Sequence, residues 1–420
     1  MPYSIPDDSF SGGQKFVRDT LHSLAEAGLK RQLRDLEGAP GPRVRLSGRE
    51  VLLLCSNNYL GLATDERLKR AAQRATEIYG CGATGSRLIS GNSEPYRELE
   101  QEIAAYKGTE AALVFASGYH ANLGAVTALV EAGDAIFSDA LNHASLIDGA
   151  RLSRAEILIY RHGDVEDLEN QLRSRSSARR KLILTETVFS MDGDFAPLCD
   201  ISYLAKKYGA LLLVDEAHAT GLFGPTGAGR VEELRLQYKV DVQMGTFSKA
   251  LGSLGGHLAA SKELVEYFLN RSRTFIFTTG LPPGVLAAST EAIRISRNEP
   301  ARRQSLWSNV ALLRNGLREL GFLLGAGESQ ILPLLLYDER RTMSACRFLL
   351  RQGVFVQGIR PPTVPPGMAR LRITPMATHT PRDLDEALAA IGKLQDLYRN
   401  PRRQRGETAP ALGGASLAPR

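Results

Sequence analysis

At residues 211–218 the chain reads Leu-Leu-Leu-Val-Asp-Glu-Ala-His, an apolar run that ends in two acids and a histidine. Consecutive apolar residues over so short a length are typical of a strand buried on both faces of a parallel sheet. Similar runs lie at residues 112–115, 135–137, 157–160 and 182–185, with amphipathic stretches between them. This alternation predicts an α/β domain whose sheet is mostly parallel.

The polar residues that follow these runs are expected to share one edge of the sheet. Asp215, Glu186 and the Ser117-Gly118 turn each come directly after a predicted strand. In open α/β sheets, the groups that bind ligands gather at the carboxyl ends of the strands. We therefore expect these residues to line the functional site.

A lysine further along the chain lies within Gly245-Thr246-Phe247-Ser248-Lys249-Ala250-Leu251-Gly252. Its neighbours are small or hydroxylic, as a crowded phosphate pocket requires, and Gly255-Gly256 lets the backbone pass close by. Lysine supplies the amine that forms a Schiff base with a carbonyl cofactor, and a carboxylate beside a pyridine nitrogen keeps that ring protonated. Lys249 and Asp215 together therefore predict a pyridoxal phosphate (PLP) site.

The turn Ser117-Gly118-Tyr119 is the candidate phosphate site. It opens a helix-like segment, where free N–H groups and the positive end of the helix dipole favour an anion. Taken alone, the turn is more simply explained as a helix cap by Ser117. Because Thr246 and Lys249 are also present, we favour the phosphate.

Two histidines follow predicted strands, as the candidate site residues above do. His143 follows the apolar run at 135–137, where its imidazole would stack on the pyridine ring and hydrogen-bond the substrate. His218, three residues past Asp215, would donate to the ring hydroxyl or orient the aspartate. Four other histidines are expected to be structural or exposed: His22, His162, His257 and His379.

Two alternative motif interpretations lack the context that they require. Asp215-Glu216-Ala217-His218 also resembles a helicase or ATPase box, but no G-x-x-x-x-G-K-[ST] loop accompanies it. Residues 80–85 have the spacing of a dinucleotide-binding loop, yet they follow the helix-like segment 68–79 instead of a strand. We therefore expect neither nucleotide hydrolysis nor nicotinamide binding.

The composition fits a globular enzyme in a reducing compartment. The 420 residues are 43% hydrophobic, and the formal charge of +6 suits an anionic cofactor or a phosphate-bearing acyl carrier. The basic run at 173–181 has no aromatic residue for base stacking, so we expect no nucleic acid partner. Four scattered cysteines indicate neither a metal site nor a disulfide framework. Because residues 1–10 lack a secretory signal and no apolar run has membrane-spanning length, we expect no membrane partner and a cytoplasmic location.

The chain is long enough to form more than one domain. In the first part, four leucines recur at roughly helical spacing before residues 38–42 break the pattern: Leu21, Leu24, Leu29 and Leu33. The tail is rich in Arg, Pro, Gly and Ala, which is typical of disorder. The predicted parts are a helix and extended segment at 1–50, a large PLP-binding α/β domain at 51–296, a smaller α+β domain at 297–400 and a disordered tail at 401–420.

Four motifs carry a family resemblance: Asn57-Asn58-Tyr59-Leu60-Gly61-Leu62, Gly85-Ser86-Arg87-Leu88-Ile89-Ser90-Gly91, Val188-Phe189-Ser190-Met191-Asp192-Gly193-Asp194 and Thr246-Phe247-Ser248-Lys249. They resemble motifs of the α-oxoamine synthases, which are fold-type I PLP-dependent transferases, and the similarity runs from about residue 21 to residue 397. The resemblance implies a mostly parallel seven-stranded sheet in the large domain. It also implies a homodimer with shared active sites.

The resemblance further implies roles for individual residues. Lys249 would carry PLP as a Schiff base, Asp215 would pair with the pyridine nitrogen, and His143 would stack on the ring. Gly118 and Tyr119 would hold the phosphate through their backbone, and Thr246 would add its hydroxyl. The rest of the cofactor shell would be Ser190, His218 and Glu186, with Thr278 and Thr279 reaching the phosphate of the neighbouring subunit. The substrate would contact Arg31, Asn57, Thr363 and Arg372.

Two segments narrow the expected substrates. Ala39-Pro40 and residues 359–365 (Ile-Arg-Pro-Pro-Thr-Val-Pro) are similar to family members of biotin biosynthesis, which condense L-alanine with a pimeloyl thioester of coenzyme A or acyl carrier protein. In the implied reaction the freed amine of Lys249 removes the α-proton, and His143 polarises the thioester carbonyl. The alternatives are glycine C-acetyltransferase, 5-aminolevulinate synthase, a serine-using sphingoid-type synthase, or a catalytically silent protein with the same fold.

Overall fold

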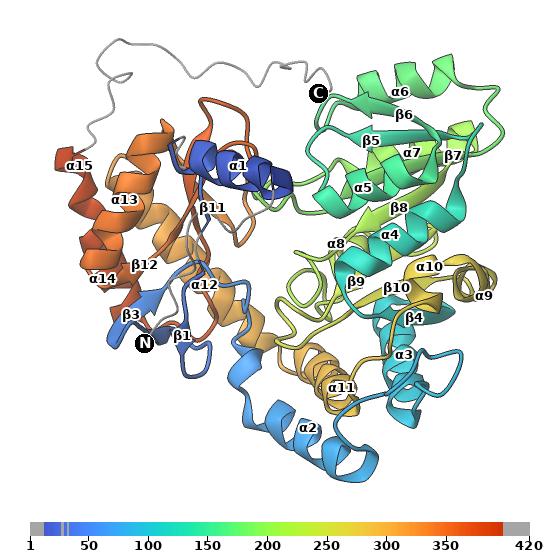
Figure 1. Cartoon of the computed structure of the whole chain (residues 1–420), viewed down its shortest axis with the longest axis horizontal. Coiled ribbons are helices and arrows are strands. Elements are labelled where there is room, and N and C mark those ends of the chain that lie inside the picture. The colour runs from blue at the N-terminus through green and yellow to red at the C-terminus, as the bar shows by residue number, and fades with distance from the viewer. Residues whose placement is uncertain (1–11, 27–28, 32, 398–420) are drawn as a thin grey trace.

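A seven-stranded sheet forms the centre of the larger part of the molecule (Figure 1). The structure, a computed structural model, describes residues 12–26, 29–31 and 33–397. Strand β10 runs antiparallel to both of its neighbours, and all other neighbouring strands are parallel, which confirms the predicted sheet. In spatial order the strands are β4 (Ala111–Phe115), β10 (Gly256–Ala260), β9 (Val242–Thr246), β8 (Leu211–Asp215), β7 (Lys181–Glu186), β5 (Ala135–Asp139) and β6 (Glu156–Tyr160).

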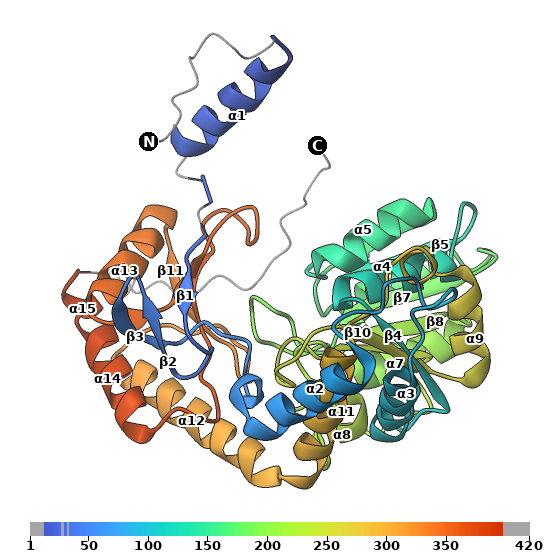
Figure 2. The same ribbon diagram turned by 60° about the horizontal axis from the view of Figure 1, so that its bottom comes forward.

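Helices cover both faces of this sheet (Figures 1 and 2). Along β7, Leu182 and Leu184 pack in one buried cluster and Ile183 packs in another, so both faces are apolar. This double burial explains why the strands are continuous apolar runs instead of alternating patterns. One cluster includes residues of α4 (Gly118–Leu129), α5 (Ala144–Ser153), α9 (Lys262–Arg271) and α10 (Arg273–Ile276); the other includes α6 (Val165–Ser174), α7 (Leu198–Tyr208) and α8 (Arg230–Glu233).

The C-terminal part contains two smaller sheets. One has the order β11 (Leu332–Tyr337), β14 (Ala369–Ile373), β13 (Gln357–Ile359), and the other has β1 (Leu36–Glu37), β2 (Arg43–Leu46), β3 (Arg49–Leu53), β12 (Val354–Phe355). Its helices are α12 (Pro300–Glu319), α13 (Glu339–Arg351), α14 (Pro381–Gly392) and α15 (Leu394–Leu397). The remaining elements are α2 (Glu66–Tyr79), α3 (Glu94–Lys107), α11 (Pro283–Asn298) and the short 3-10 helices η2 (Gly12–Gln14) and η3 (Leu62–Thr64).

Strand β3 joins the beginning of the chain to its last third. It pairs in parallel with β12, with Leu52 opposite Val354 and Leu53 opposite Phe355. Residues 49–53 therefore belong to a C-terminal sheet, although the sequence placed the start of the large domain at residue 51. The domain boundaries stay a prediction, and this pairing favours a first boundary beyond Leu53.

The N-terminal helix is shorter than the leucine spacing predicted. Helix α1 spans Lys15–Glu26, so Leu29 and Leu33 lie beyond it, and Leu33 is 99% exposed. The helix has no buried residue and projects away from the rest of the molecule (Figure 2). No packed face therefore extends it to Leu33. The segment 1–10 and the predicted disordered tail 401–420 lie outside the described residues.

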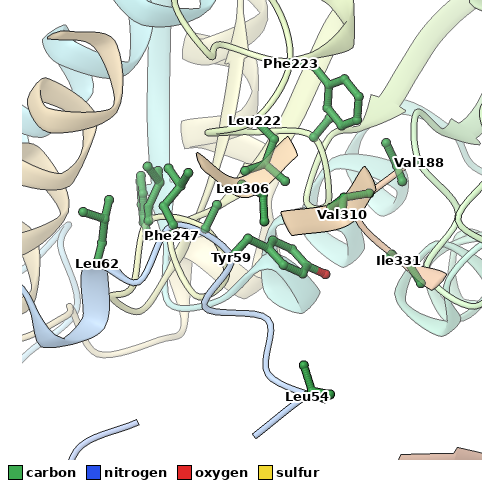
Figure 3. Packing of buried hydrophobic residues seen from close by; sticks show 14 of the residues in the cluster. Leu54, Tyr59, Leu62, Val188, Leu222, Phe223, Phe247, Leu306, Val310 and Ile331 are labelled. Atoms are coloured by element: carbon green, nitrogen blue, oxygen red, sulfur yellow. The ribbon is translucent and has the colours of Figure 1, made fainter. Parts of the chain in front are cut away.

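A buried apolar cluster connects the two parts of the molecule. Tyr59, Phe247 and Leu306 come from three distant segments and lie together in it (Figure 3). Tyr59 and Phe247 belong to the loops that enter the site described below, so the cluster fixes the base of those loops. In the described part of the chain, no helix combines the length and the apolar character needed to cross a membrane.

Candidate active site

Most of the predicted cofactor residues gather at the carboxyl edge of the seven-stranded sheet. Asp215 is the last residue of β8, Glu186 the last of β7 and Thr246 the last of β9, and these strands are parallel. His143 caps α5, which follows β5. The edge predicted from the sequence is therefore where the structure brings these side chains together.

Asp215 is buried and held by two donors. Asn122 donates from Nδ2 to its Oδ2 over 2.7 Å, and the Ala217 N–H donates to its Oδ1 over 2.8 Å. Asp215 is only 5% exposed, so little water is available to stabilise its carboxylate. A buried carboxylate fixed in this way is suited to face a protonated ring nitrogen.

Lys249 follows β9 and lies within electrostatic reach of Asp215. Burial of its amine is the largest influence on its pKa, which is lowered to about 8 although the negative charges of Asp215 and Glu186 oppose this shift. The positive charge of Arg372 lowers the pKa further. About a tenth of the amine is therefore neutral at pH 7, and the neutral amine is the form that attacks a carbonyl.

Both predicted site histidines are neutral in this arrangement. Burial lowers the pKa of His143, with Lys249 acting in the same sense and Asp215 against it. Burial also lowers the pKa of His218 well below its ordinary value, and the charges of Lys249 and Arg372 add to this shift. His218 Nδ1 is hydrogen-bonded to the hydroxyl of Tyr59 at 2.8 Å, which leaves Nε2 for another partner.

Glu186 lies beside this group with one carboxylate oxygen, Oε1, buried and without a partner among the described residues. Burial raises the pKa of Glu186 well above its ordinary value, and the charge of Asp215 adds to this shift. A buried carboxyl group with an oxygen that has no partner can donate or accept a hydrogen bond, which indicates that it binds a polar group of a ligand. This observation fits the expected cofactor, whose ring and imine present such groups.

The candidate phosphate site also fits its proposed ligand. Ser117 caps α4 by accepting from the His120 N–H, and the first N–H groups of the helix have no partner within the helix. Thr246 Oγ1 lies at the same end, since a Cβ on Gly118 would be 3.7 Å from it. A Cβ on Gly256 would lie 2.6 Å from the Cα of Gly118, so only glycine permits this close approach.

Arg372 on β14 brings a buried guanidinium to the same site. It donates from Nε to the Ser190 carbonyl over 2.7 Å, from Nη1 to Asn57 Oδ1 over 3.2 Å and from Nη2 to Tyr59 Oη over 3.3 Å. No carboxylate of the described residues forms an ion pair with it. A buried guanidinium that faces only neutral acceptors is suited to receive the carboxylate of an amino acid.

Other predicted residues lie apart from this buried group. Arg31 and Thr363 are exposed, and in the described ranges no hydrogen bond or ion pair joins them to it. The side chain of Tyr119 is 42% exposed and its hydroxyl is hydrogen-bonded to Asp148, whereas its backbone N–H, which is expected to bind the phosphate, lies in the first turn of α4. Thr278 and Thr279 line a shallow pocket with Arg87 and Tyr96. The roles of all these residues stay predictions.

Two residues that the sequence did not select are central to the geometry. Asn122 lies one helical turn after Gly118, which places it over Asp215. Tyr59 is fully buried, and its hydroxyl contacts Asn57, His218 and Arg372. Its position within a recognised motif was a signal, but its contacts come from segments far apart in the sequence.

The fold and this lysine–aspartate site define a class of protein, and comparison with known families agrees. The profile of the aminotransferase class I and II family matches residues 49–391, so the chain belongs to this family. Within it, the chain is 52% identical to the 8-amino-7-oxononanoate synthase of Citrifermentans bemidjiense, over 91% of this chain and 98% of that protein. This similarity places it in the 8-amino-7-oxononanoate synthase branch of the family.

Solved structures share the fold. A serine palmitoyltransferase variant from S. paucimobilis with a bound PLP–myriocin aldimine has a TM-score of 0.87 and 35% identity, over 92% of this chain and 98% of that chain. An 8-amino-7-oxononanoate synthase from Francisella tularensis has a TM-score of 0.72 and 26% identity, over 83% and 99% of the two chains. Both are similar along nearly the whole described chain.

Proposed function

We propose that the protein is a PLP-dependent acyltransferase that condenses L-alanine with a pimeloyl thioester and forms 8-amino-7-oxononanoate in biotin biosynthesis. The observation that carries this proposal is the pairing of Lys249 and Asp215 with a buried guanidinium, Arg372, that has no acidic partner among the described residues. The 52% identity to a curated 8-amino-7-oxononanoate synthase selects the substrates.

The chain's own residues would carry the proton and charge movements. Bound PLP would supply an electron sink for negative charge at the α-carbon of alanine. Arg372 and Asn57 would bind the alanine carboxylate, and the neutral amine of Lys249 would accept the α-proton. The α-carbon would then bond to the thioester carbonyl carbon as the C–S bond breaks and the thiol carrier leaves. The carboxylate would depart as carbon dioxide, and the α-carbon would take a proton back from the Lys249 ammonium.

His143 would assist at the thioester carbonyl. Its Nδ1 accepts from the Ser145 N–H at 3.2 Å, so the proton of the neutral ring lies on Nε2. An Nε2–H donor would stabilise the oxyanion that develops as the carbon–carbon bond forms.

A substrate comparison tests the proposal. Purified full-length protein with PLP is assayed for product by mass spectrometry with L-alanine and pimeloyl-CoA, beside glycine and acetyl-CoA and beside L-serine and palmitoyl-CoA. We expect the first pair to exceed the others in kcat/KM by at least about a hundredfold. Faster turnover of either other pair would assign the chain to a sister activity, and absence of any visible cofactor band would indicate a silent protein. A parallel assay with pimeloyl-acyl carrier protein identifies the carrier.

We also propose a homodimer that shares its sites. Thr279 forms a β-bridge with Ser86, and the nearby Ile89 and Phe277 are 85% and 70% exposed, as an interface with a second copy would require. Lys249→Ala and Thr278→Ala/Thr279→Ala proteins would each be impaired, and refolding the two together should restore activity through mixed dimers. Failure of mixing to restore activity would contradict shared sites. The cytoplasmic location stays a prediction that cell fractionation tests.

A further inference from the structure

His162 forms a charged bridge outside the predicted cofactor shell. Its Nδ1 lies 2.8 Å from Asp139 Oδ1, and its Nε2 lies 2.8 Å from Asp194 Oδ2. An imidazole can satisfy two carboxylates at once only if both nitrogens carry a proton, which makes it an imidazolium. The ring also stands edge-on to the buried Phe189, at 4.4 Å between centroids.

The charge state follows from the surroundings. Burial alone would lower the pKa of His162, but the hydrogen bonds and charges of Asp139 and Asp194 raise it to about 10. The His162 ring is therefore an imidazolium throughout the neutral range, held between two carboxylates. Charge-assisted hydrogen bonds of this kind are shorter and stronger than neutral ones, so the geometry is well defined.

One end of the bridge is anchored in the sheet. Asp139 is the last residue of β5 and is almost fully buried. Its carboxylate also accepts from the Leu141 N–H over 2.8 Å and the Gly163 N–H over 3.0 Å. These bonds make Asp139 a fixed point.

The other end holds the loop at residues 189–194, here called the Ser190 loop. The Asp194 carbonyl accepts from the Phe189 N–H over 3.0 Å, which closes the loop. On its opposite side, the Ser190 carbonyl accepts from Arg372 Nε over 2.7 Å. The loop therefore lies between the His162 bridge and the guanidinium of the site.

We propose that His162 is a positioning residue: its imidazolium, held between Asp139 and Asp194, fixes the Ser190 loop and thereby the orientation of Arg372 toward the amino acid carboxylate. This inference rests on the proposed function for the identity of the carboxylate. The hydrogen bonds of His162 to Asp139 and Asp194 do not depend on the proposed function. Without the bridge, the Ser190 carbonyl would move and Arg372 would lose the acceptor that orients its Nε.

Two variants test the bridge from its two sides. His162→Gln removes the charge and one donor, and Asp194→Asn keeps the shape of the loop side chain but removes its charge. Arg175→Gln is the matched control, because Arg175 pairs with Glu156 at the start of β6 and contacts no residue of the Ser190 loop among the described residues. All variants are compared as full-length protein, with and without PLP.

Two readouts separate positioning from a general loss of stability. Hydrogen exchange measured by mass spectrometry should accelerate in the peptide covering residues 187–195 in both bridge variants and stay unchanged in the control. The dissociation constant for L-alanine, followed by the change in the visible spectrum of the PLP form, should rise roughly tenfold in each bridge variant. The double variant should be no weaker than either single variant, since both remove one interaction.

Unchanged exchange in the loop, or additive effects in the double variant, would overturn the proposal. If the PLP-loaded bridge variants bind L-alanine as the parent does, His162 has only a structural role. If the parent protein itself gives no spectral response to PLP or L-alanine, the proposed function fails, and the exchange comparison without PLP still decides whether the bridge fixes the loop.

Discussion

Asn122 donates one N–H of its side chain to Asp215 over 2.7 Å and the other to Ser145 Oγ over 2.8 Å. The Ser145 N–H donates to His143 Nδ1 over 3.2 Å, so this ring nitrogen is an acceptor and also receives the proton of the Ser145 hydroxyl, 2.8 Å away. One amide therefore ties the acid proposed for the ring nitrogen to the histidine proposed for the ring face. The protein sets the tautomer of His143 through the same residue that orients Asp215.

Replacing Asn122 by Ala should impair the site without removing any group that contacts substrate. Asp215 would lose a buried donor, a change worth about 1–3 kcal/mol, which corresponds to a loss of roughly 5-fold to 150-fold in kcat. Steady-state kinetics with L-alanine and pimeloyl-CoA measure the loss. Asp215→Asn, which keeps the shape but not the charge, should cost more than Asn122→Ala, and the reverse order would contradict the assignment of Asp215.

Lys249→Ala should abolish both the visible absorbance of bound PLP and turnover, because Lys249 is the lysine placed beside Asp215 among the residues that the structure describes. The absorbance spectrum after dialysis and the product assay measure these two losses. Lys262→Ala is the matched control, since Lys262 is exposed at the start of α9 and should leave both properties unchanged. A Lys249→Ala protein that retains covalent PLP would refute the assignment.

The uptake of PLP by the cofactor-free protein should depend on pH through the amine of Lys249. Its pKa is about 8, so the reactive neutral fraction rises about tenfold per pH unit below that value and levels off above it. Stopped-flow absorbance measures the rate at each pH. In Asp215→Asn the midpoint should move to lower pH, because the charge of Asp215 raises the pKa of Lys249. A midpoint that moves upward would contradict this coupling.

Glu186→Gln should stabilise the cofactor-free protein at alkaline pH. The folded pKa of Glu186 lies well above its ordinary value of 4.5, so folding must retain a proton that the unfolded chain has released. Stability is therefore lost as pH rises above about 4.5, and glutamine avoids this loss. Thermal unfolding should show a gain of at least about 1 kcal/mol at pH 8 and little at pH 4.

Glu216→Gln should lower the stability of the protein, in contrast to Glu186→Gln. Glu216 forms an ion pair with Lys107 at 2.8 Å in which neither side chain is exposed. Removing its charge leaves the lysine buried and unpaired, which should destabilise the protein by about 3–5 kcal/mol. Thermal unfolding at neutral pH measures this loss. A gain in stability for Glu216→Gln would contradict this prediction and would show that the ion pair lowers the free energy of unfolding.

The sequence predicted which edge of the sheet carries the site, because the signal for the end of a buried strand lies within a few consecutive residues. Asp215 and Glu186 each end an apolar run, and a buried strand needs no distant partner to be recognised. Strands β9 and β10 were not recognised because Val-Gln-Met-Gly-Thr and Gly-His-Leu-Ala-Ala contain glycine and few β-branched residues. Their position between β4 and β8 is set by tertiary packing.

The histidines show where local information ends. His257 was expected to be structural or exposed, and it is buried on β10. His162 had no distinguishing neighbours in sequence, because Asp139 and Asp194 lie 23 and 32 residues away and meet it only when β5, β6 and the Ser190 loop are assembled. A residue whose partners come from three separate segments cannot be selected from spacing alone.

The parallel pairing of β3 with β12 joins residues about three hundred positions apart along the chain. During synthesis, residues 49–53 leave the ribosome long before residues 354–355 are made. Until then, the edge of β3 that pairs with β12 has unpaired backbone N–H and C=O groups. The smaller sheet can therefore close only near the end of translation, after the seven-stranded sheet has had time to form. Newly made chains that stop short of β12 would expose that edge to one another, which makes premature termination an aggregation hazard for this protein.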